Sequence, residues 1–212
     1  SHDMARAMGA RFLLRMEDID IARCSAEFEA RMLSDLAWLG LDWERPVRRQ
    51  SEHFETYEKT LRKLDAMGLL YPCFASRKEI AGHARPGQCD PDGAPLYPGL
   101  HKALTREDIL RRKEAGEPFA LRLDMEKAIA LAGRQSGRAL TFCELDPASG
   151  ETKTIAADPA RWGDAVIARK EAPASYHLSV VVDDALQGIT HVTRGRDLYA
   201  ATDIHRLLQT LL

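Results

Sequence analysis

The 212-residue sequence predicts an α/β fold in which helices surround a parallel sheet and a mixed α/β segment is inserted. Three observations favour this class. Helical and strand patterns alternate along the chain. A continuously apolar, β-branched run at residues 180–182 is typical of a strand covered on both faces. A proline- and glycine-rich stretch between residues 72 and 98 interrupts the pattern and indicates a boundary or an insertion.

Composition limits the possible classes of protein. With 45% hydrophobic and 29% charged residues, the chain can bury a core and form one domain, or one domain with an insertion. No apolar run reaches membrane-spanning length, the start lacks a secretory signal, and the four cysteines are widely spaced. We therefore expect a cytoplasmic protein, a monomer without membrane contact, whose cysteines are free thiols.

The net charge of −2 gives no overall attraction toward nucleic acid. Any contact with RNA must then come from local basic clusters, at residues 45–49 and 111–113. For each cluster taken alone, solvated charges at helix ends are the favoured interpretation.

The first elements predicted are a helix end and a strand. Residues 3–7 resemble the last turn of a helix closed by Gly9, and residues 11–16 form a short, mostly apolar strand. We interpret a helix cut at its beginning as a sign that the chain starts inside a fold.

Two amphipathic helices follow. One begins after the N-cap Ser25 and ends at Gly40, and the other begins at Ser51 and ends at Gly68. Both carry an apolar stripe, so we expect both to contribute to the core. The stripes consist of Phe28, Met32, Leu33 and Leu36 in the first helix and Phe54, Tyr57, Leu61 and Leu64 in the second.

The middle third reads as a mixed α/β subdomain. Thr105 begins a capping-box pattern ahead of a helix that ends at Gly116, and residues 119–125 alternate as a strand does. Residues 145–155 fit a hairpin. In the final third, residues 180–182 and 189–192 are predicted strands, and a helix begins at Thr202.

Polar residues directly after the first strand mark a candidate site. Arg15 lies at the end of that strand and Glu17, Asp18 and Asp20 follow it. Ligands of open parallel sheets bind outside the carboxyl ends of strands. These carboxylates could coordinate Mg²⁺, accept hydrogen bonds from a substrate amine, or cap the next helix.

A second group lies near the end of the chain. Arg194, expected at a strand end and followed by glycine, suits a small carboxylate because a guanidinium makes two hydrogen bonds in fixed geometry. Tyr176 lies seven residues before the pair that begins with Asp183 and continues with Asp184. For these aspartates we favour a turn or a helix cap, and for His191 an ordinary strand histidine.

Three stretches, residues 11–23, 68–77 and 176–198, resemble the glutamyl-tRNA synthetase family in order and spacing. Within that family the sequence is more similar to glutamyl-queuosine tRNA(Asp) synthetases. Full glutamyl-tRNA synthetases usually carry asparagine at the position of Val180 and a Gly-Glu-Asp-His run at residues 195–198. The resemblance implies a Rossmann-like class I aminoacyl-tRNA synthetase catalytic domain, formed by residues 1–72 and 166–212, with an acceptor-binding-like insertion at residues 73–165.

The implied activity is ATP-dependent activation of L-glutamate and its transfer to queuosine in the anticodon of tRNA(Asp), with ATP and Mg²⁺ required. The alternatives are a discriminating glutamyl-tRNA synthetase and a non-catalytic paralogue that binds tRNA or glutamate. The family's ATP-handling HIGH-type and KMSKS-type motifs do not occur in the sequence. We therefore expect these 212 residues to be catalytically incomplete, and they indicate no catalytic residue.

Site residues follow from the resemblance. Glu17 matches the family's glutamate-binding acid, which holds the substrate ammonium, and Tyr176 matches a tyrosine of the same pocket. Arg194 matches the arginine that pairs with a substrate carboxylate. Asp20 and Arg23 match positions near the tRNA acceptor end.

Many relatives also bind zinc through a C-x-C pair, a later tyrosine and a further cysteine. Here Cys73 and Tyr97 fit, but Ala75 and His101 replace the two other ligands, and Cys89 is the one further candidate. We favour ordinary packing of Cys73 over a zinc site.

Overall fold

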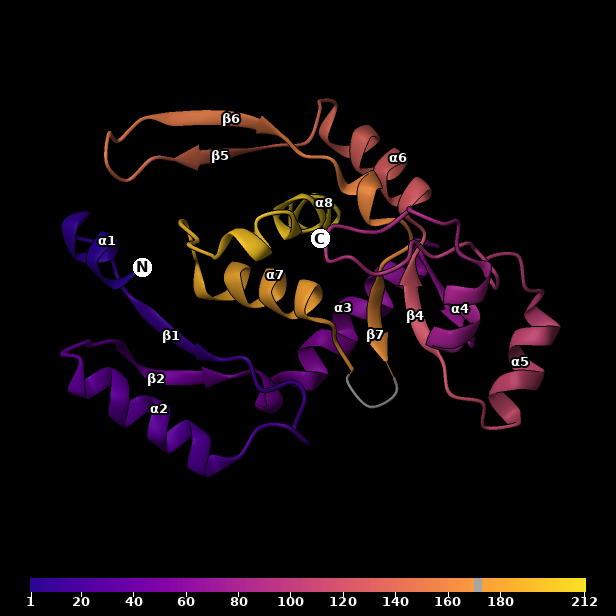
Figure 1. Cartoon of the computed structure of the whole chain (residues 1–212), viewed down its shortest axis with the longest axis horizontal. Helices are drawn as coiled ribbons and strands as arrows, with labels where there is room; N and C mark the ends of the chain where they lie inside the picture. The colour runs from indigo at the N-terminus through magenta and orange to yellow at the C-terminus, as the bar shows by residue number, and fades with distance from the viewer. Residues whose placement is uncertain (170–172) are drawn as a thin grey trace.

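The computed structural model describes residues 1–169 and 173–212 of the chain (Figure 1). Its elements, in chain order, are α1 His2–Ala7, β1 Leu13–Met16, α2 Ala26–Trp38, β2 Glu44–Arg49, η1 Gln50–His53, α3 Phe54–Ala66, β3 Leu70–Cys73, α4 Arg77–His83, α5 Arg106–Glu114, β4 Ala120–Leu123, α6 Met125–Ser136, β5 Thr141–Leu145, β6 Thr152–Ala156, η2 Pro159–Trp162, β7 Val166–Arg169, α7 Tyr176–Gln187, η3 Arg196–Leu198 and α8 Ala201–Leu211. In these ranges, no helix is long and apolar enough to cross a membrane.

The strands of the described chain form three small sheets. β1 and β2 pair in parallel, β3, β4 and β7 form an antiparallel sheet in that order, and β5 pairs with β6 as a hairpin. The α/β class is confirmed, and its parallel component is the β1–β2 pair. Because β3 and β7 both pair with β4, the antiparallel sheet crosses the insertion boundaries that we predicted near residues 73 and 165.

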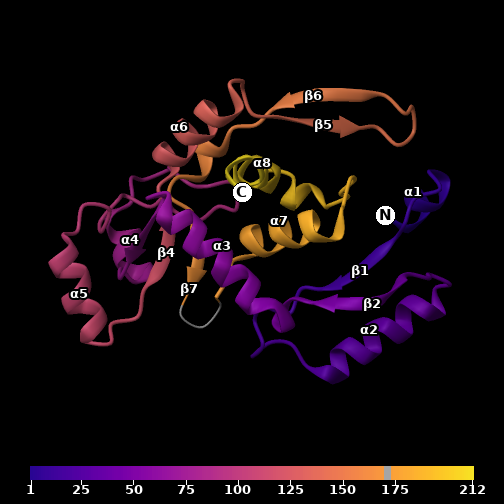
Figure 2. The ribbon, with the colours of Figure 1, turned by 180° about the vertical axis from the view of Figure 1, so that it is seen from behind.

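Helices α3, α6, α7 and α8 enclose the core together with β4 and β7. Figure 1 and the reverse view in Figure 2 place α7 and α8 at the centre of the molecule, between the β1–β2 pair and the β3–β4–β7 sheet. The buried cluster includes Tyr57, Leu123, Ile167, Leu178 and Leu208, all fully buried. Burying such side chains supplies the main stabilisation of a fold of this kind.

The strand predictions at residues 180–182 and 189–192 are wrong. Residues 180–182 lie in α7, which Ser175 caps by accepting a hydrogen bond from the Leu178 amide and which ends at Gly188 with φ +66°. Helix α7 is packed on several sides, so its apolar residues run continuously and look like a buried strand. Residues 189–192 have no regular structure.

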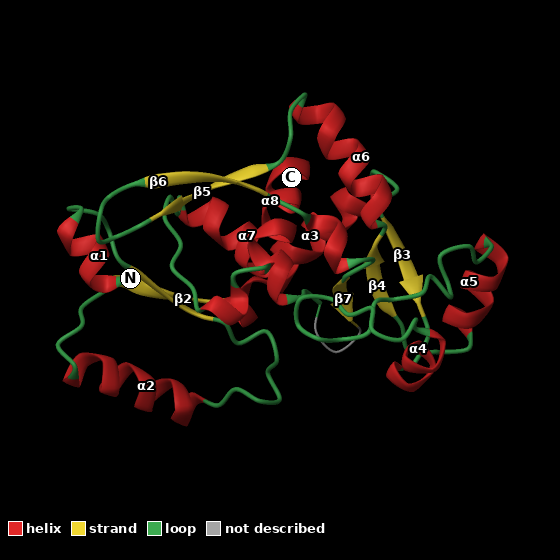
Figure 3. Cartoon of the chain, turned by 45° about the horizontal axis from the view of Figure 1, so that its top comes forward, coloured by secondary structure: helices red, strands yellow, loops and turns green. Residues whose placement is uncertain are grey.

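The core role predicted for the helix after Ser25 is also wrong. Ser25 caps α2 as expected, with a 3.2 Å hydrogen bond from the Phe28 amide. However, α2 has no buried residue, and Phe28 is 63% exposed. Figure 3 shows α2 on the outside of the molecule, along β2. A sheet of only two strands gives α2 little surface on which to pack its apolar stripe.

Most of the other element predictions are confirmed, including the strand now seen as β4, the β5–β6 hairpin, helices α5 and α8, and the free cysteines. The predicted helix start at Ser51 is wrong, because Ser51 lies inside η1 and α3 begins at Phe54. Ser51 donates both its backbone N–H and its hydroxyl to Asp18, at 2.9 and 2.6 Å. Helix α4 was not predicted, although Ser76 and Glu79 form a complete capping box at its start.

Candidate active site

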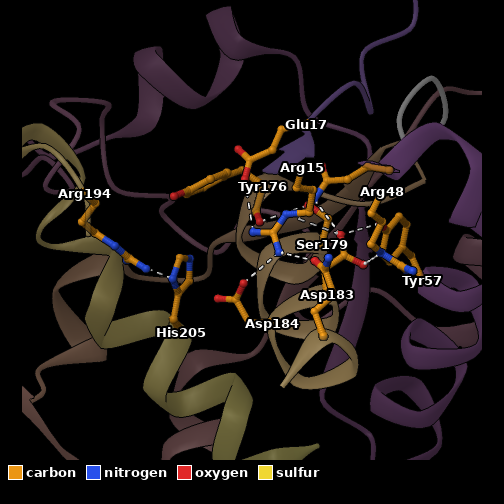
Figure 4. Close-up of polar contacts among 12 residues, drawn as sticks. Arg15, Glu17, Arg48, Tyr57, Tyr176, Ser179, Asp183, Asp184, Arg194 and His205 are labelled. Carbon is orange, nitrogen blue, oxygen red and sulfur yellow. Dashed lines mark hydrogen bonds and ion pairs between the residues drawn. The ribbon is translucent and has the colours of Figure 1, made fainter. Parts of the chain in front are cut away.

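A cavity of about 520 Å³ lies between α1, β1, one side of α7 and the loop that follows α7. Glu17, Tyr176 and Arg194 all line it, although they come from positions up to 177 residues apart in the chain. The three side chains predicted to contact one substrate therefore surround one space. Figure 4 shows Tyr176 close beneath Glu17. Arg194 lies at the left edge of the residues drawn there.

Arg15 fixes the acidic side of this cavity. Its Nη1 donates to Asp184 at 2.8 Å and to Gln187 at 3.1 Å, and its Nη2 donates to Glu17 at 3.3 Å. The Arg15 side chain is only 16% exposed, whereas Glu17 is 44% exposed. Glu17 thus keeps an accessible carboxylate, while Asp184 is held by the guanidinium.

Asp183, next to Asp184 in α7, is fully buried and does not line this cavity. Its carboxylate accepts hydrogen bonds from Arg48 Nε at 2.8 Å, Gln50 Nε2 at 2.9 Å and the Tyr57 hydroxyl at 2.9 Å. Burial and the adjacent carboxylate together raise the pKa of Tyr57 well above its ordinary value. The expected turn or helix cap is therefore wrong for Asp183, which lies within α7, as does Asp184.

Sequence reasoning missed the role of Asp183. The available signal was a carboxylate that directly follows three buried valines, because a buried charge needs partners. Its partners lie more than 120 residues earlier in the chain, and nothing in the local sequence identifies them.

Arg194 lies in the loop between α7 and η3, and not at a strand end as predicted. Its Nη1 donates to His205 Nδ1 at 3.1 Å and to Thr202 Oγ1 at 3.3 Å. Both partners are neutral groups on α8. His191, predicted as a strand histidine, is an exposed loop residue within hydrogen-bond distance of the Thr190 hydroxyl.

Two histidines connect to Arg194 in series: His205 contacts Arg194, and His177 contacts His205. His205 is 3% exposed, and its Nε2 lies 3.2 Å from His177 Nδ1. Burial lowers the pKa of His177 to about 4, and burial together with the neighbouring His177 and Arg194 lowers the pKa of His205 to about 2. Both imidazoles are therefore neutral at physiological pH.

A second cavity, of about 720 Å³, adjoins the first at Tyr176, which lines both. It lies between the start of α7, α4 and the β4–β7 strands, and Asp20 also lines it. Arg23 forms an ion pair of 3.3 Å with Asp20, and its side chain is 86% exposed. Of the two residues predicted near the acceptor end, Asp20 therefore lines this second cavity, Arg23 contacts it through Asp20, and neither lines the first.

Three of the candidate zinc ligands, Cys73, Tyr97 and His101, lie near one another. Tyr97 accepts a hydrogen bond from the His101 amide, and His101 Nδ1 accepts one from the Phe74 amide. Burial and a hydrogen bond with Cys73 raise the pKa of Tyr97. Among the residues that the structure describes, no three His, Cys, Asp or Glu side chains gather as metal ligands. Zinc needs four ligands, so the set does not fit.

The basic clusters are largely matched by local acids. Arg48 and Arg49 pair with Asp183 and Glu29, while Arg111 and Arg112 pair with Asp108 and Glu117. The interpretation as solvated charges at a helix end fits residues 111–113, which form the last turn of α5. It is wrong for Arg48 and Arg49, because both lie in β2 and the Arg48 side chain is only 17% exposed.

This α/β fold, with a polar cavity beside a parallel strand pair, is that of a class I synthetase catalytic domain. Residues 1–212 match the family model described as tRNA synthetases class I (E and Q), catalytic domain, and the chain therefore belongs to that family.

Within the family, the chain is 46% identical to the Glutamyl-Q tRNA(Asp) synthetase of Rhodobacter capsulatus, over 100% of this chain and 74% of that protein. It is 36% identical to the protein of the same name from Symbiobacterium thermophilum, of which it spans 62%. It is also 36% identical to the Glutamate--tRNA ligase of Aquifex aeolicus, over 93% of this chain and 38% of that protein. The fold resembles that of the glutamate-tRNA synthetase from Elizabethkingia anophelis, with a TM-score of 0.70, 20% identity, and coverage of 98% of this chain and 42% of that one.

Proposed function

We propose that this chain is the glutamate-binding part of a ligase that activates L-glutamate with ATP and transfers it to queuosine in the anticodon of tRNA(Asp). The observation that carries the proposal is the single cavity lined by Glu17, Tyr176 and Arg194. This cavity offers a carboxylate for the substrate ammonium and a guanidinium for a substrate carboxylate. The expected cytoplasmic location is consistent with a tRNA substrate.

The roles of these side chains follow from their charges. Glu17 accepts hydrogen bonds from the α-ammonium group, and Arg194 donates to a carboxylate of glutamate. Charge-assisted hydrogen bonds of this kind are about twice as strong as neutral ones. Tyr176 lies between the two cavities and bounds the space in which the activated carboxyl group meets its acceptor.

The second cavity is our proposed entry for the nucleoside that accepts glutamate. Asp20 lines it and Arg23 lies at its edge through the ion pair between them. Because it meets the first cavity at Tyr176, an acceptor hydroxyl placed there would approach the activated carboxyl directly. Holding two reactants side by side in this way contributes much of the rate enhancement of group transfer.

ATP and Mg²⁺ complete the proposal. The phosphates need positive charge as the glutamate carboxylate attacks the α-phosphorus, and this catalysis is mostly positioning and electrostatic stabilisation. The described residues contain no cluster of acids that could hold a metal ion by themselves. Mg²⁺ would therefore bind chiefly through the ATP phosphates, as it commonly does.

Transfer to queuosine, and not to the end of tRNA(Glu), is favoured by Val180. This residue lines the first cavity and is 3% exposed, at a position where full glutamyl-tRNA synthetases usually have asparagine. A cavity with valine here offers one polar group fewer to the substrate, which fits a branch with its own mode of glutamate binding.

The test uses the full-length protein with ATP, labelled glutamate, and three RNAs: tRNA(Asp) with queuosine, tRNA(Asp) without queuosine, and tRNA(Glu). Label on queuosine-bearing tRNA(Asp) alone is the expected result. Label on tRNA(Glu) would make the protein a discriminating glutamyl-tRNA synthetase. Glutamate binding without labelling of any RNA would favour a non-catalytic paralogue.

A further inference from the structure

We propose that His205, supported by His177, is the positioning residue that holds the Arg194 guanidinium toward the substrate without neutralising its charge. This inference rests on the proposed function, since it concerns how the glutamate cavity keeps its cation available. Figure 4 shows the contact between Arg194 and His205 at the edge of the group that surrounds Tyr176.

The proton positions follow from the contacts. A guanidinium only donates hydrogen bonds, so His205 Nδ1, 3.1 Å from Arg194 Nη1, must be the acceptor. The proton of the neutral His205 ring is then on Nε2, which donates to His177 Nδ1 at 3.2 Å. His177 in turn carries its proton on Nε2. Hydrogen-bond donation thus runs in one direction, from Arg194 to His205 and from His205 to His177.

Burial keeps these three hydrogen-bonded side chains in one protonation state. His205 is 3% exposed, and the groups that face it are His177 and Tyr176 from α7 and Arg194 from the preceding loop. Within residues 1–169 and 173–212, no carboxylate hydrogen-bonds to either histidine. Protonation of His205 would place two cations against each other and leave Arg194 without its acceptor.

The type of side chain that pairs with Arg194 affects which substrate the cavity selects. The acids of the first cavity are held elsewhere: Arg15 binds both Asp184 and Glu17. Arg194 pairs with no acid within the described ranges, and its partners on α8 are an imidazole and a hydroxyl. A neutral acceptor orients a guanidinium but leaves its full charge to attract an anionic ligand. A carboxylate at the same place would cancel that charge and weaken discrimination between glutamate and glutamine.

Three substitutions at His205 separate orientation from charge. In the full-length protein, His205→Asn keeps a neutral acceptor near the Nδ1 position, His205→Ala removes the acceptor, and His205→Asp keeps an acceptor but adds negative charge. His83→Ala is the matched control, because His83 is an exposed histidine at the end of α4 that lines neither cavity.

The readouts are the KM values for glutamate and for ATP in ATP–pyrophosphate exchange and glutamate binding by calorimetry. We expect His205→Ala to raise the KM for glutamate roughly 3- to 10-fold, the effect of losing one ordinary hydrogen bond, with the KM for ATP unchanged. His205→Asn should stay near wild type. His205→Asp should weaken glutamate binding more than His205→Ala does and reduce the preference for glutamate over glutamine.

Wild-type glutamate binding in both His205→Ala and His205→Asp would overturn the inference. If His205→Ala does not fold, the comparison of His205→Asn with His205→Asp still decides, because both retain an acceptor and differ in charge. In an Arg194→Gln background, His205→Ala should have no further effect on the KM for glutamate. Absence of glutamate binding by the wild-type protein would instead remove the proposed function itself.

Discussion

Asp183 in α7 accepts a 2.8 Å hydrogen bond from Arg48 in β2, although 135 residues separate them. The carboxylate is fully buried, and Gln50 and Tyr57 also donate hydrogen bonds to it. This contact joins the parallel strand pair to the helix that forms one wall of the first cavity. The position of that cavity therefore depends on a buried ion pair.

Replacing Asp183 by alanine should lower the free energy of unfolding by about 3 to 5 kcal/mol, because Arg48, only 17% exposed, would lose its charged partner. Asp183→Asn should cost less, since an amide oxygen can still accept from one donor. Urea denaturation followed by circular dichroism measures both. Asp35→Asn, at an exposed acid of α2, is the control and should have little effect. A loss of stability no larger than that of the control would show that the buried contact contributes little.

Replacing Arg194 by glutamine should raise the glutamate concentration needed for half-saturation by roughly 10- to 150-fold, since a charged hydrogen bond contributes about 1.5 to 3 kcal/mol. Glutamate titration of the full-length protein measures this. Arg196→Gln provides a matched control, because Arg196 is exposed and lines neither cavity. Unchanged saturation in the Arg194 variant would remove this residue from the site.

Stability should fall as the pH decreases below about 6.5. In the unfolded chain both histidines titrate near 6.5, whereas in the folded protein the pKa of His177 is about 4 and that of His205 about 2. Between pH 6.5 and about 4 the unfolded state therefore binds more protons, and each histidine lowers stability by about 1.4 kcal/mol per pH unit.

Carboxylates also titrate toward the acid end of this range, so wild type must be compared with His205→Asn by urea denaturation at pH 7, 6 and 5. The variant lacks one of the two histidines and should show a shallower decline. Parallel curves for the two proteins would mean that His205 does not remain neutral in the folded state.

Zinc should be substoichiometric in the purified protein, because the Cys73 region does not gather four ligands. Metal analysis after dialysis measures the content, and the midpoint of thermal unfolding should not change when a chelator is added. Cys73→Ala should lower stability only as a small buried residue does. One bound zinc per chain, lost together with stability on chelation, would contradict this prediction.

The sequence by itself determined the elements whose signals are local, and the family. Capping residues such as Ser25 and Thr105, a glycine at a helix end and the hairpin at residues 145–155 identify structure through contacts between near neighbours. The resemblance over residues 11–23, 68–77 and 176–198 indicated the family and selected Glu17, Tyr176 and Arg194, because it depends on residue identity and order alone.

Only the tertiary structure decided how apolar runs and isolated charges are used. The run at residues 180–182 is helical because α7 is surrounded by other elements, so its sequence loses the helical period that would distinguish it from a strand. Asp183 and His205 acquire their roles from Arg48 and Arg194, which reach them from elsewhere in the chain. The properties of a buried polar group depend on which partners surround it, and those partners are fixed by packing rather than by the neighbouring sequence.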